Sequence, residues 1–221
     1  MCEDPTCAKC SKVVCDTQRS EQGPSNCPTK SKRSVIERTL AEYRKPEVRE
    51  FARQASIQES EGYMNLPEGK TPRNPRVEEV AQFALKMGYR RIGIAFCVGL
   101  RNEARILTAL LENRGFVVVS VCCKAGGTPK EAIGITEEQK TAGPGVWETM
   151  CSPIAQAEIL NDEKTEFNIV VGLCVGHDSL FLKYSQAPTT VLIAKDRVFG
   201  HNPAVGLYLS QSYYRKLLRK E

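Results

Sequence analysis

Ile92–Leu107 reads I-G-I-A-F-C-V-G-L-R-N-E-A-R-I-L, and Ile169–Tyr184 repeats its pattern as I-V-V-G-L-C-V-G-H-D-S-L-F-L-K-Y. In both stretches an apolar run leads through Cys-Val-Gly into a helix-like segment. The repeat predicts two strand–turn–helix units in which Cys97 and Cys174 occupy equivalent places. Ligands of open α/β sheets bind outside the carboxyl ends of the strands, so the two cysteines are candidates for one shared site.

Outward from this repeat, strand and helix patterns alternate through the second half of the chain. The predicted strands are Arg91–Cys97, Phe116–Cys123, Asn168–Leu173 and Thr190–Ala194, and the predicted helices are Asn102–Arg114, Cys151 to Asn161, Asp178–Tyr184 and Pro203 to Leu218. This alternation predicts a Rossmann-like, three-layer α/β domain with a mostly parallel sheet. The Val-rich second strand is typical of a strand covered on both faces. The long loop Ala125–Glu148 is a candidate functional loop.

The N-terminal part has a different organisation. Residues 1–33 contain five cysteines and few large apolar side chains, so this segment either stays disordered or folds around a metal. Residues 34–221 are predicted as the α/β domain, beginning with a helical part over residues 34–88. Pro46 is expected to divide a helical pattern in that part into two helices, and residues 62–73 are expected to be a polar loop.

Composition and charge exclude several classes of protein. The net charge of +5 is small for 221 residues and the basic residues are scattered, so nucleic acid is not an expected partner. No apolar run reaches the roughly 20 residues of a membrane span, and no signal-peptide pattern begins the chain, so a cytoplasmic location is expected. The glycine-rich nucleotide motifs are absent. Ten cysteines in a reducing compartment therefore point to metal or redox chemistry.

Five cysteines are predicted to meet at one edge of the sheet. Cys97, Cys122, Cys123 and Cys174 end strands, and Cys151 opens a helix that starts at the same edge. Adjacent strand residues face opposite ways, so one of Cys122 and Cys123 is expected in the site, and the sequence leaves open which. Helix N-termini favour thiolates, and Gly99 and Gly176 would let backbone N–H groups approach sulfur.

Four such thiolates predict a 4Fe–4S cluster, with zinc as the competing metal. The wide separation of the cysteines in the chain favours the cluster, because structural zinc sites usually contain close C-x-x-C pairs. The alternative is that these cysteines are ordinary apolar residues of the core.

A second set of thiols lies near the N-terminus. Cys7-x₂-Cys10-x₄-Cys15-x₁₁-Cys27 contains one tight C-x-x-C pair, and Cys2 could replace one ligand. This spacing is typical of a metal site, with zinc favoured over a second iron–sulfur cluster. The alternative is a flexible, reactive thiol tail.

Polar residues surround the predicted core site. The candidate catalytic residues are Lys124, His177, Asp178 and His201. Lys195 and Arg197 follow the fourth strand and, with Lys124 and His201, could hold a small anionic ligand or balance the charge of a cluster. Alternatively, Asp178 caps a helix and each cation is an ordinary surface residue.

Long motifs in the chain resemble a known family. These motifs are Ile92–Leu100, Ser120–Gly126, Met150–Asn161, Gly172–Ser185 and Lys195–Pro203, together with the N-terminal cysteines. They are similar to the uncharacterised prokaryotic cysteine-rich metal-binding proteins grouped as domain of unknown function 1847. The resemblance implies metal binding by Cys7, Cys10, Cys15 and Cys27 and implies no particular reaction. The proposed core cluster depends on the strand-end argument alone.

Three functions are compatible with these patterns. The first is an iron–sulfur protein that performs electron transfer, or redox or sulfur chemistry on a small ligand under the Ala125–Glu148 loop, with a redox partner protein. The second is a non-enzymatic zinc-binding module whose core cysteines are structural. The third is a cluster-free thiol or persulfide enzyme that uses Cys174 or Cys97. The patterns do not decide between an enzyme and a non-enzyme, and they do not indicate the oligomeric state.

Overall fold

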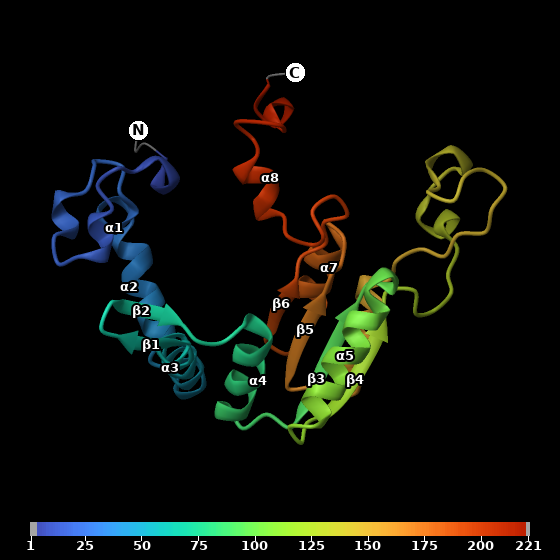
Figure 1. The fold of residues 1–221 in the computed structure, drawn as a ribbon, viewed down its shortest axis with the longest axis horizontal. Coiled ribbons are helices and arrows are strands. Elements are labelled where there is room, and N and C mark those ends of the chain that lie inside the picture. The colour runs from blue at the N-terminus through green and yellow to red at the C-terminus, as the bar shows by residue number, and fades with distance from the viewer. Residues whose placement is uncertain (1–3, 220–221) are drawn as a thin grey trace. The chain divides into compact units, whose positions relative to one another are not determined.

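The computed structural model describes residues 4–219 and divides into two compact units, Met1–Glu61 and Gly62–Glu221 (Figure 1). No helix within the described residues has both the length and the apolar composition that crossing a bilayer requires. The unit that contains the N-terminal cysteines continues through two further helices to Glu61.

The first unit consists of short turns followed by helices. Its 3₁₀ turns are Cys7–Lys9, Val14–Asp16 and Ser20–Gln22, and its helices are α1 (Pro28–Ser31), α2 (Arg33–Glu42) and α3 (Pro46–Glu61). The expected break at Pro46 is present, because proline suits the first turn of a helix and not its interior. Val35 and Leu40 are 44% and 53% exposed, so their apolar side chains form no buried core in this unit.

The second unit begins with a β-hairpin. The prediction of a polar loop over residues 62–73 is therefore wrong. Strand β1 (Tyr63–Leu66) pairs antiparallel with β2 (Gly69–Pro72), with Leu66 opposite Gly69. Pro67 and Glu68 form the two-residue turn between them. Proline at the second turn position and glycine at the fourth favour such a turn, and this signal escapes a search for long apolar strands.

A four-stranded, wholly parallel sheet forms the centre of the second unit. Its strands are β3 (Arg91–Phe96), β4 (Val117–Cys122), β5 (Phe167–Val171) and β6 (Thr189–Ile193), in the order β4-β3-β5-β6. Strands β3 and β5 are central and almost completely buried. Helices α5 and α6 both contact β4, as expected for a strand covered on both faces, but β4 is an edge strand and is only partly buried, with Val117 53% exposed.

Helices cover both faces of this sheet and complete three layers. The helices of the unit are α4 (Arg76–Lys86), α5 (Arg101–Glu112), α6 (Pro153–Asp162), α7 (His177–Tyr184) and α8 (Ala204–Tyr208). Phe96 of β3 and Ser120 of β4 line a hollow with Ala104 of α5, which packs in front of these strands in Figure 1. A Cβ added to Gly93 of β3 would lie 2.9 Å from Leu160, which places α6 on the opposite face.

The prediction of one C-terminal helix from Pro203 to Leu218 is wrong. Helix α8 ends at Tyr208, and after several turns a 3₁₀ segment covers Arg215–Leu218. The Ser210 hydroxyl donates to the Leu207 carbonyl at 2.7 Å, and Ser212 bonds back to the chain in the same way. Serine side chains that bond to nearby backbone compete with the helix, which explains its early end.

The chain order has a reversal point between β3 and β5. From β3 the chain passes through α5 to β4 on one side, then through α6 back to β5 on the other side. The strand order therefore reverses between β3 and β5, and in open α/β sheets this is where ligands bind. The Cys97 N–H donates to the Val171 carbonyl at 3.1 Å, so Cys97 lies at this point.

Candidate functional site

Cys97 and Cys123 meet at the carboxyl edge of the sheet. They directly follow β3 and β4, and their exposed fractions are only 9% and 2%. The Sγ of Cys123 accepts a hydrogen bond from the Val98 N–H at 3.3 Å. Cys122 pairs with Phe96 in the sheet and therefore lies on the face covered by α5. Of the two adjacent cysteines, Cys123 is thus the one on the α6 face, beside Val98 and Cys97.

Cys151 joins this pair from the start of α6. The Ser152 N–H donates to the Cys123 carbonyl at 2.7 Å, which holds the helix start against the end of β4. A hydrogen bond links the side chains of Cys123 and Cys151. This bond, with the positive charges of Lys124 and His177, lowers the pKa of Cys151 to about 5, whereas its partner and burial raise the pKa of Cys123. The directions of these two shifts favour the proton on Cys123 and the negative charge on Cys151.

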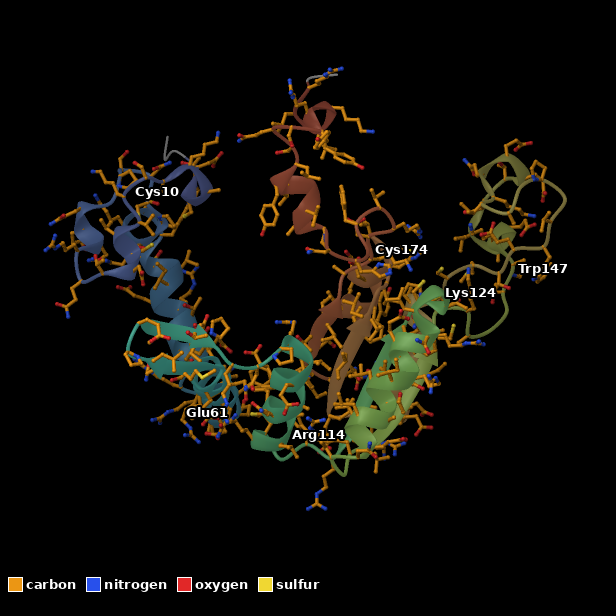
Figure 2. All side chains as sticks on the ribbon, in the orientation of Figure 1. Cys10, Glu61, Arg114, Lys124, Trp147 and Cys174 are labelled. Carbon is orange, nitrogen blue, oxygen red and sulfur yellow. The ribbon has the colours of Figure 1, made fainter. Side chains whose placement is uncertain are left out.

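Cys174 lies between the end of β5 and the start of α7. Its carbonyl accepts hydrogen bonds from the backbone N–H groups of His177 and Asp178 at 2.9 and 3.1 Å. The Arg197 guanidinium donates to the Cys174 Sγ at 3.0 Å. Figure 2 shows Cys174 and Lys124 at the same end of the sheet. A cation thus faces this thiol directly.

The loop after β6 holds Arg197 in place through Asp196. One carboxylate oxygen of Asp196 accepts hydrogen bonds from the N–H groups of Val198 and Phe199, each at 2.9 Å. The ring of His201 accepts the Asp196 N–H through Nδ1 at 3.2 Å, and the His201 N–H donates to the Asp196 carbonyl at 2.8 Å. His201 was expected to contact an anion, but its Nδ1 stabilises the conformation of the loop instead.

Two lysines add positive charge at the same edge. Lys124 donates to the Thr149 carbonyl at 2.5 Å and lies close enough to Cys151 to lower its pKa. The Nζ of Lys195 lies 3.3 Å from where a Cβ on Gly99 would stand, and the Cys97 Sγ lies 3.9 Å from the same point. Lys195 therefore approaches Cys97 across the space that glycine leaves.

The turn after Cys174 has a conformational role. Gly176 has a φ of +85° and occupies the cap position of α7, and nothing lies within 4 Å of a Cβ placed there. Glycine is required for the backbone conformation and not for a close approach. Asp178 accepts the Ser179 N–H at 2.8 Å inside the first turn of α7. The alternative that Asp178 caps this helix is wrong, because Gly176 occupies the N-cap position.

Gln156 is a residue of the site region that the sequence did not indicate. It is fully buried on α6, and its Nε2 donates to the carbonyls of Val121 at 2.7 Å and Phe96 at 3.2 Å. This side chain joins the ends of β3 and β4 just before Cys97 and Cys123. Its Oε1 is buried and has no hydrogen-bond partner among the described residues. A polar residue on the apolar stripe of a helix is the signal that could have revealed it.

The long loop after Lys124 is tied back to itself beside the site. The Met150 N–H donates to the Thr128 carbonyl at 2.8 Å, and the Lys130 N–H donates to the Glu148 carbonyl at 3.0 Å. These bonds form a short antiparallel stem. Trp147, within this loop, is 68% exposed.

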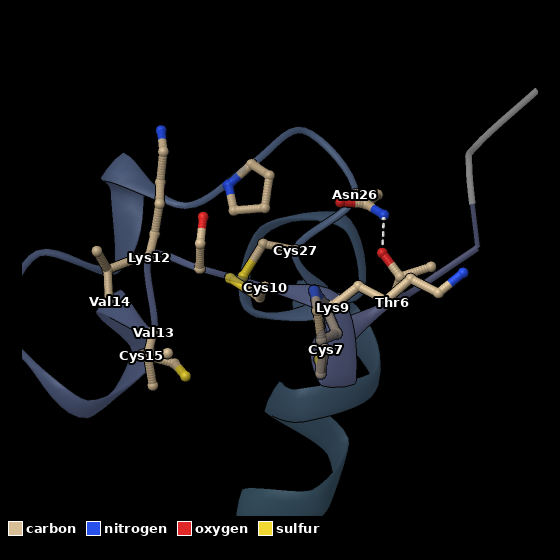
Figure 3. Close-up of a pocket in the computed structure, with 13 residues that line it drawn as sticks. Thr6, Cys7, Lys9, Cys10, Lys12, Val13, Val14, Cys15, Asn26 and Cys27 are labelled. Atoms are coloured by element: carbon tan, nitrogen blue, oxygen red, sulfur yellow. Dashed lines mark hydrogen bonds between the residues drawn. The ribbon is translucent and has the colours of Figure 1, made fainter. Parts of the chain in front are cut away.

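The four N-terminal cysteines line one cavity of about 250 Å³ (Figure 3). Its walls include Cys7, Cys10, Cys15 and Cys27. Hydrogen bonds from the side chain and backbone N–H of Thr29 lower the pKa of Cys27. Such N–H and O–H donors to sulfur are typical of the surroundings of metal-bound thiolates. Cys2, considered as a replacement ligand, lies outside the described residues.

The chemistry of both thiol sets suits a soft metal, although the side chains of neither set converge on one metal position. Between residues 4 and 219, no three His, Cys, Asp or Glu side chains form a group that could hold a metal ion. Each of the nine cysteines in this range is a free thiol. All-sulfur sets with nearby cations and hydrogen-bond donors fit zinc or iron–sulfur clusters by donor type.

Comparison with known proteins assigns the chain to a family. The family described as "Protein of unknown function (DUF1847)" matches residues 27–192, which include Cys27 and every core cysteine. The chain belongs to this family. The chain is also 42% identical to an uncharacterized protein of Methanocaldococcus jannaschii over 212 residues, which cover 96% of this chain and 97% of the relative. These findings confirm the resemblance seen in the motifs, and neither description names a reaction.

Proposed function

We propose that Cys97, Cys123, Cys151 and Cys174 hold a 4Fe–4S cluster and that the protein uses it for electron transfer, or for redox or sulfur chemistry on a small ligand. The observation that carries this proposal is that buried Cys97 and Cys123 follow the adjacent strands β3 and β4, with Cys151 held beside Cys123 by the Ser152 N–H, next to the place where the strand order reverses. Rossmann-like domains bind their ligands at this place. When bound, the cluster would supply a one-electron donor and acceptor.

The residues around the thiols support an anionic group in the site. A cluster held by four thiolates carries net negative charge, and Lys124, Lys195 and Arg197 surround the cysteines with positive charge. Hydrogen bonds from Arg197 to Cys174 and from Val98 to Cys123 act on sulfur, where such bonds tune the potential of a cluster. The same cations would hold a small anionic ligand beside the cluster. Free thiols are consistent with the reducing cytoplasm as the location.

The N-terminal cavity is proposed as a separate metal site. Its four cysteines would hold zinc as a structural metal, because two ligands come from one C-x-x-C turn. A second iron–sulfur cluster is the alternative and would let this segment exchange electrons with a redox partner protein. The two cases differ in metal content and colour.

The first experiment compares adjacent cysteines. The full chain and its variants Cys123→Ser and Cys122→Ser are purified anaerobically, and iron, acid-labile sulfide and zinc are measured per chain. Cys122 lies on the other face of the sheet, so its variant is a matched control with the same chemical change one residue away. We expect about four iron and four sulfide in the wild type and in Cys122→Ser, and at least a severalfold loss in Cys123→Ser.

Other results would contradict the cluster or the assignment of its ligands. Zinc without iron, unchanged by either substitution, would leave a non-enzymatic zinc-binding module with structural core cysteines. Equal loss of iron in both variants would mean that Cys122 and Cys123 do not differ in role. Cys174→Ser gives a second, independent removal of one core thiol.

A cluster-free thiol or persulfide enzyme is the second candidate, and one observation favours it. The Cys123 thiol and the ammonium group of Lys124 both lower the pKa of Cys151. This is the environment of a nucleophilic thiolate. This geometry points to Cys151 as the nucleophile in place of Cys174 or Cys97. Iron-free protein in which iodoacetamide modifies Cys151 first at neutral pH would support the enzyme.

A further inference from the structure

A second hollow lies on the opposite face of the sheet, away from the thiol site. It has a volume of about 430 Å³ and lies between the start of α5 and strands β3 and β4. Its walls are Phe96, Arg101, Asn102, Ala104, Arg105, Thr108 and Ser120. This volume is within the range of small-molecule sites. The two lining arginines make the hollow positively charged, and none of its lining residues is acidic.

The two guanidinium groups of this hollow are available to a ligand. Within the described residues the Arg101 side chain forms no hydrogen bond or ion pair, and the Arg105 side chain donates only to Asn102, another residue of the same wall, at 3.1 Å. Residues four apart on a helix lie on one face, so both arginines can reach one ligand. Uncompensated arginines side by side repel each other, and an anion between them removes that repulsion.

We propose that this hollow binds a phosphate monoester that carries an aromatic or apolar group. A phosphate has three free oxygens for two arginines and neighbouring hydroxyl and amide donors, whereas a carboxylate has only two. Ser120 contributes an exposed hydroxyl, and Asn102 contributes a side-chain amide. The half-buried ring of Phe96 and the methyl group of Ala104 give the ligand an apolar contact.

This site goes beyond the proposed function and does not depend on it. The thiols lie on and beyond the strand ends toward α6, whereas the hollow is on the α5 face. Phe96 of the hollow immediately precedes Cys97 in the chain. Loss of the cluster and loss of phosphate binding are therefore separate results.

The test titrates the full chain with phenyl phosphate, inorganic phosphate and benzoate, followed by calorimetry and by the amide and arginine Nε resonances of labelled protein. We expect saturable binding of phenyl phosphate at least tenfold tighter than of inorganic phosphate or benzoate, with shifts at Arg101 and Ser120. The double variant Arg101→Gln/Arg105→Gln should lose at least tenfold in affinity. The variant Arg73→Gln removes one exposed arginine elsewhere in the same unit and should bind as the wild type does.

Three results would overturn the proposal. They are the absence of saturable phenyl phosphate binding, equal affinity in the double variant and the wild type, and benzoate that binds as tightly as phenyl phosphate. The first two would remove the site, and the third would remove its phosphate specificity. Circular dichroism of each variant shows whether it is folded, and the single variant Arg101→Gln provides the test if the double variant is not.

Discussion

The Arg197 guanidinium lies 3.0 Å from the Cys174 Sγ and donates a hydrogen bond to it across 23 residues of sequence. The two residues come from neighbouring connections, one after β6 and the other after β5. Parallel strands bring their carboxyl ends to one edge, so the sheet alone accounts for their approach. Asp196 then fixes the loop in the conformation that aims Arg197 at the thiol.

Removal of this cation is expected to change the redox behaviour of the loaded protein. In Arg197→Gln the sulfur of Cys174 loses a positive charge and its donor, so the reduced, more negative cluster becomes less favourable. The midpoint potential should become more negative, by about 40 mV for each kcal/mol of lost interaction in a one-electron couple. A redox titration followed by electron paramagnetic resonance measures it. Arg73→Gln is the charge-matched control, and an unchanged potential in Arg197→Gln would show that the bond to Cys174 does not act on a cluster.

The pH dependence of alkylation tests the Cys123–Cys151 pair in iron-free, reduced protein. Because the pKa of Cys151 is lowered to about 5, its thiolate is present above that pH and disappears as the pH falls through it. We expect the rate at Cys151 to be half-maximal near pH 5 and constant at neutral pH, as measured by mass spectrometry of its peptide. An ordinary thiol would still be gaining reactivity up to about pH 8.5.

A substitution at Cys123 provides the control for this assignment. Cys123→Ala removes the thiol that donates to Cys151, and the half-maximal pH should rise toward that of an ordinary cysteine. A profile that stays the same in Cys123→Ala would assign the low pKa to Lys124 and His177 alone. A wild-type profile centred near pH 8.5 would contradict the pair altogether.

Gly93 is expected to be essential for packing between β3 and its neighbours. A Cβ at this position would lie 2.0 Å from the Oδ1 of Asn168 and 2.9 Å from Leu160. Asn168 is held by hydrogen bonds to Thr165 at 2.8 Å and Ser185 at 2.9 Å, so it has no freedom to move aside. Gly93→Ala should lower the free energy of unfolding by about 1–3 kcal/mol.

Urea denaturation measures this change in the free energy of unfolding. The control Val117→Ala alters a side chain that is 53% exposed at the start of the edge strand, and a change within about 0.5 kcal/mol is expected. If Gly93→Ala were as stable as this control, the close packing of β3 against Asn168 would be incorrect.

The sequence alone predicts the part of the fold that depends on long, regular patterns. Apolar runs followed by helical periodicity place β3, β5 and their helices within a residue or two of where they lie. The same repeat brings Cys97 and Cys174 to one edge, because a parallel sheet aligns its strand ends. The family resemblance was likewise carried by long motifs and is confirmed by the match to residues 27–192.

The remaining features depend on tertiary contacts that no local pattern contains. Whether Cys122 or Cys123 faces the site is decided by the exact end of β4, and a shift of one residue would exchange them. Strand β4 lies at the edge because of the strand order in the sheet. The valines of β4 do not indicate that order. The partners of Gln156 come from two separate strands, and the orientation of Arg197 comes from loop bonds to Asp196.

The hydrogen bond between Thr128 and Met150 brings the two ends of the long loop together beside the thiols. Residues 129–149 form an excursion whose two feet are already held together by backbone hydrogen bonds, so the separation of Cys123 and Cys151 does not depend on its length. This segment is therefore free to lengthen, shorten or accept an inserted tag during divergence, while the thiols that it separates in sequence remain neighbours.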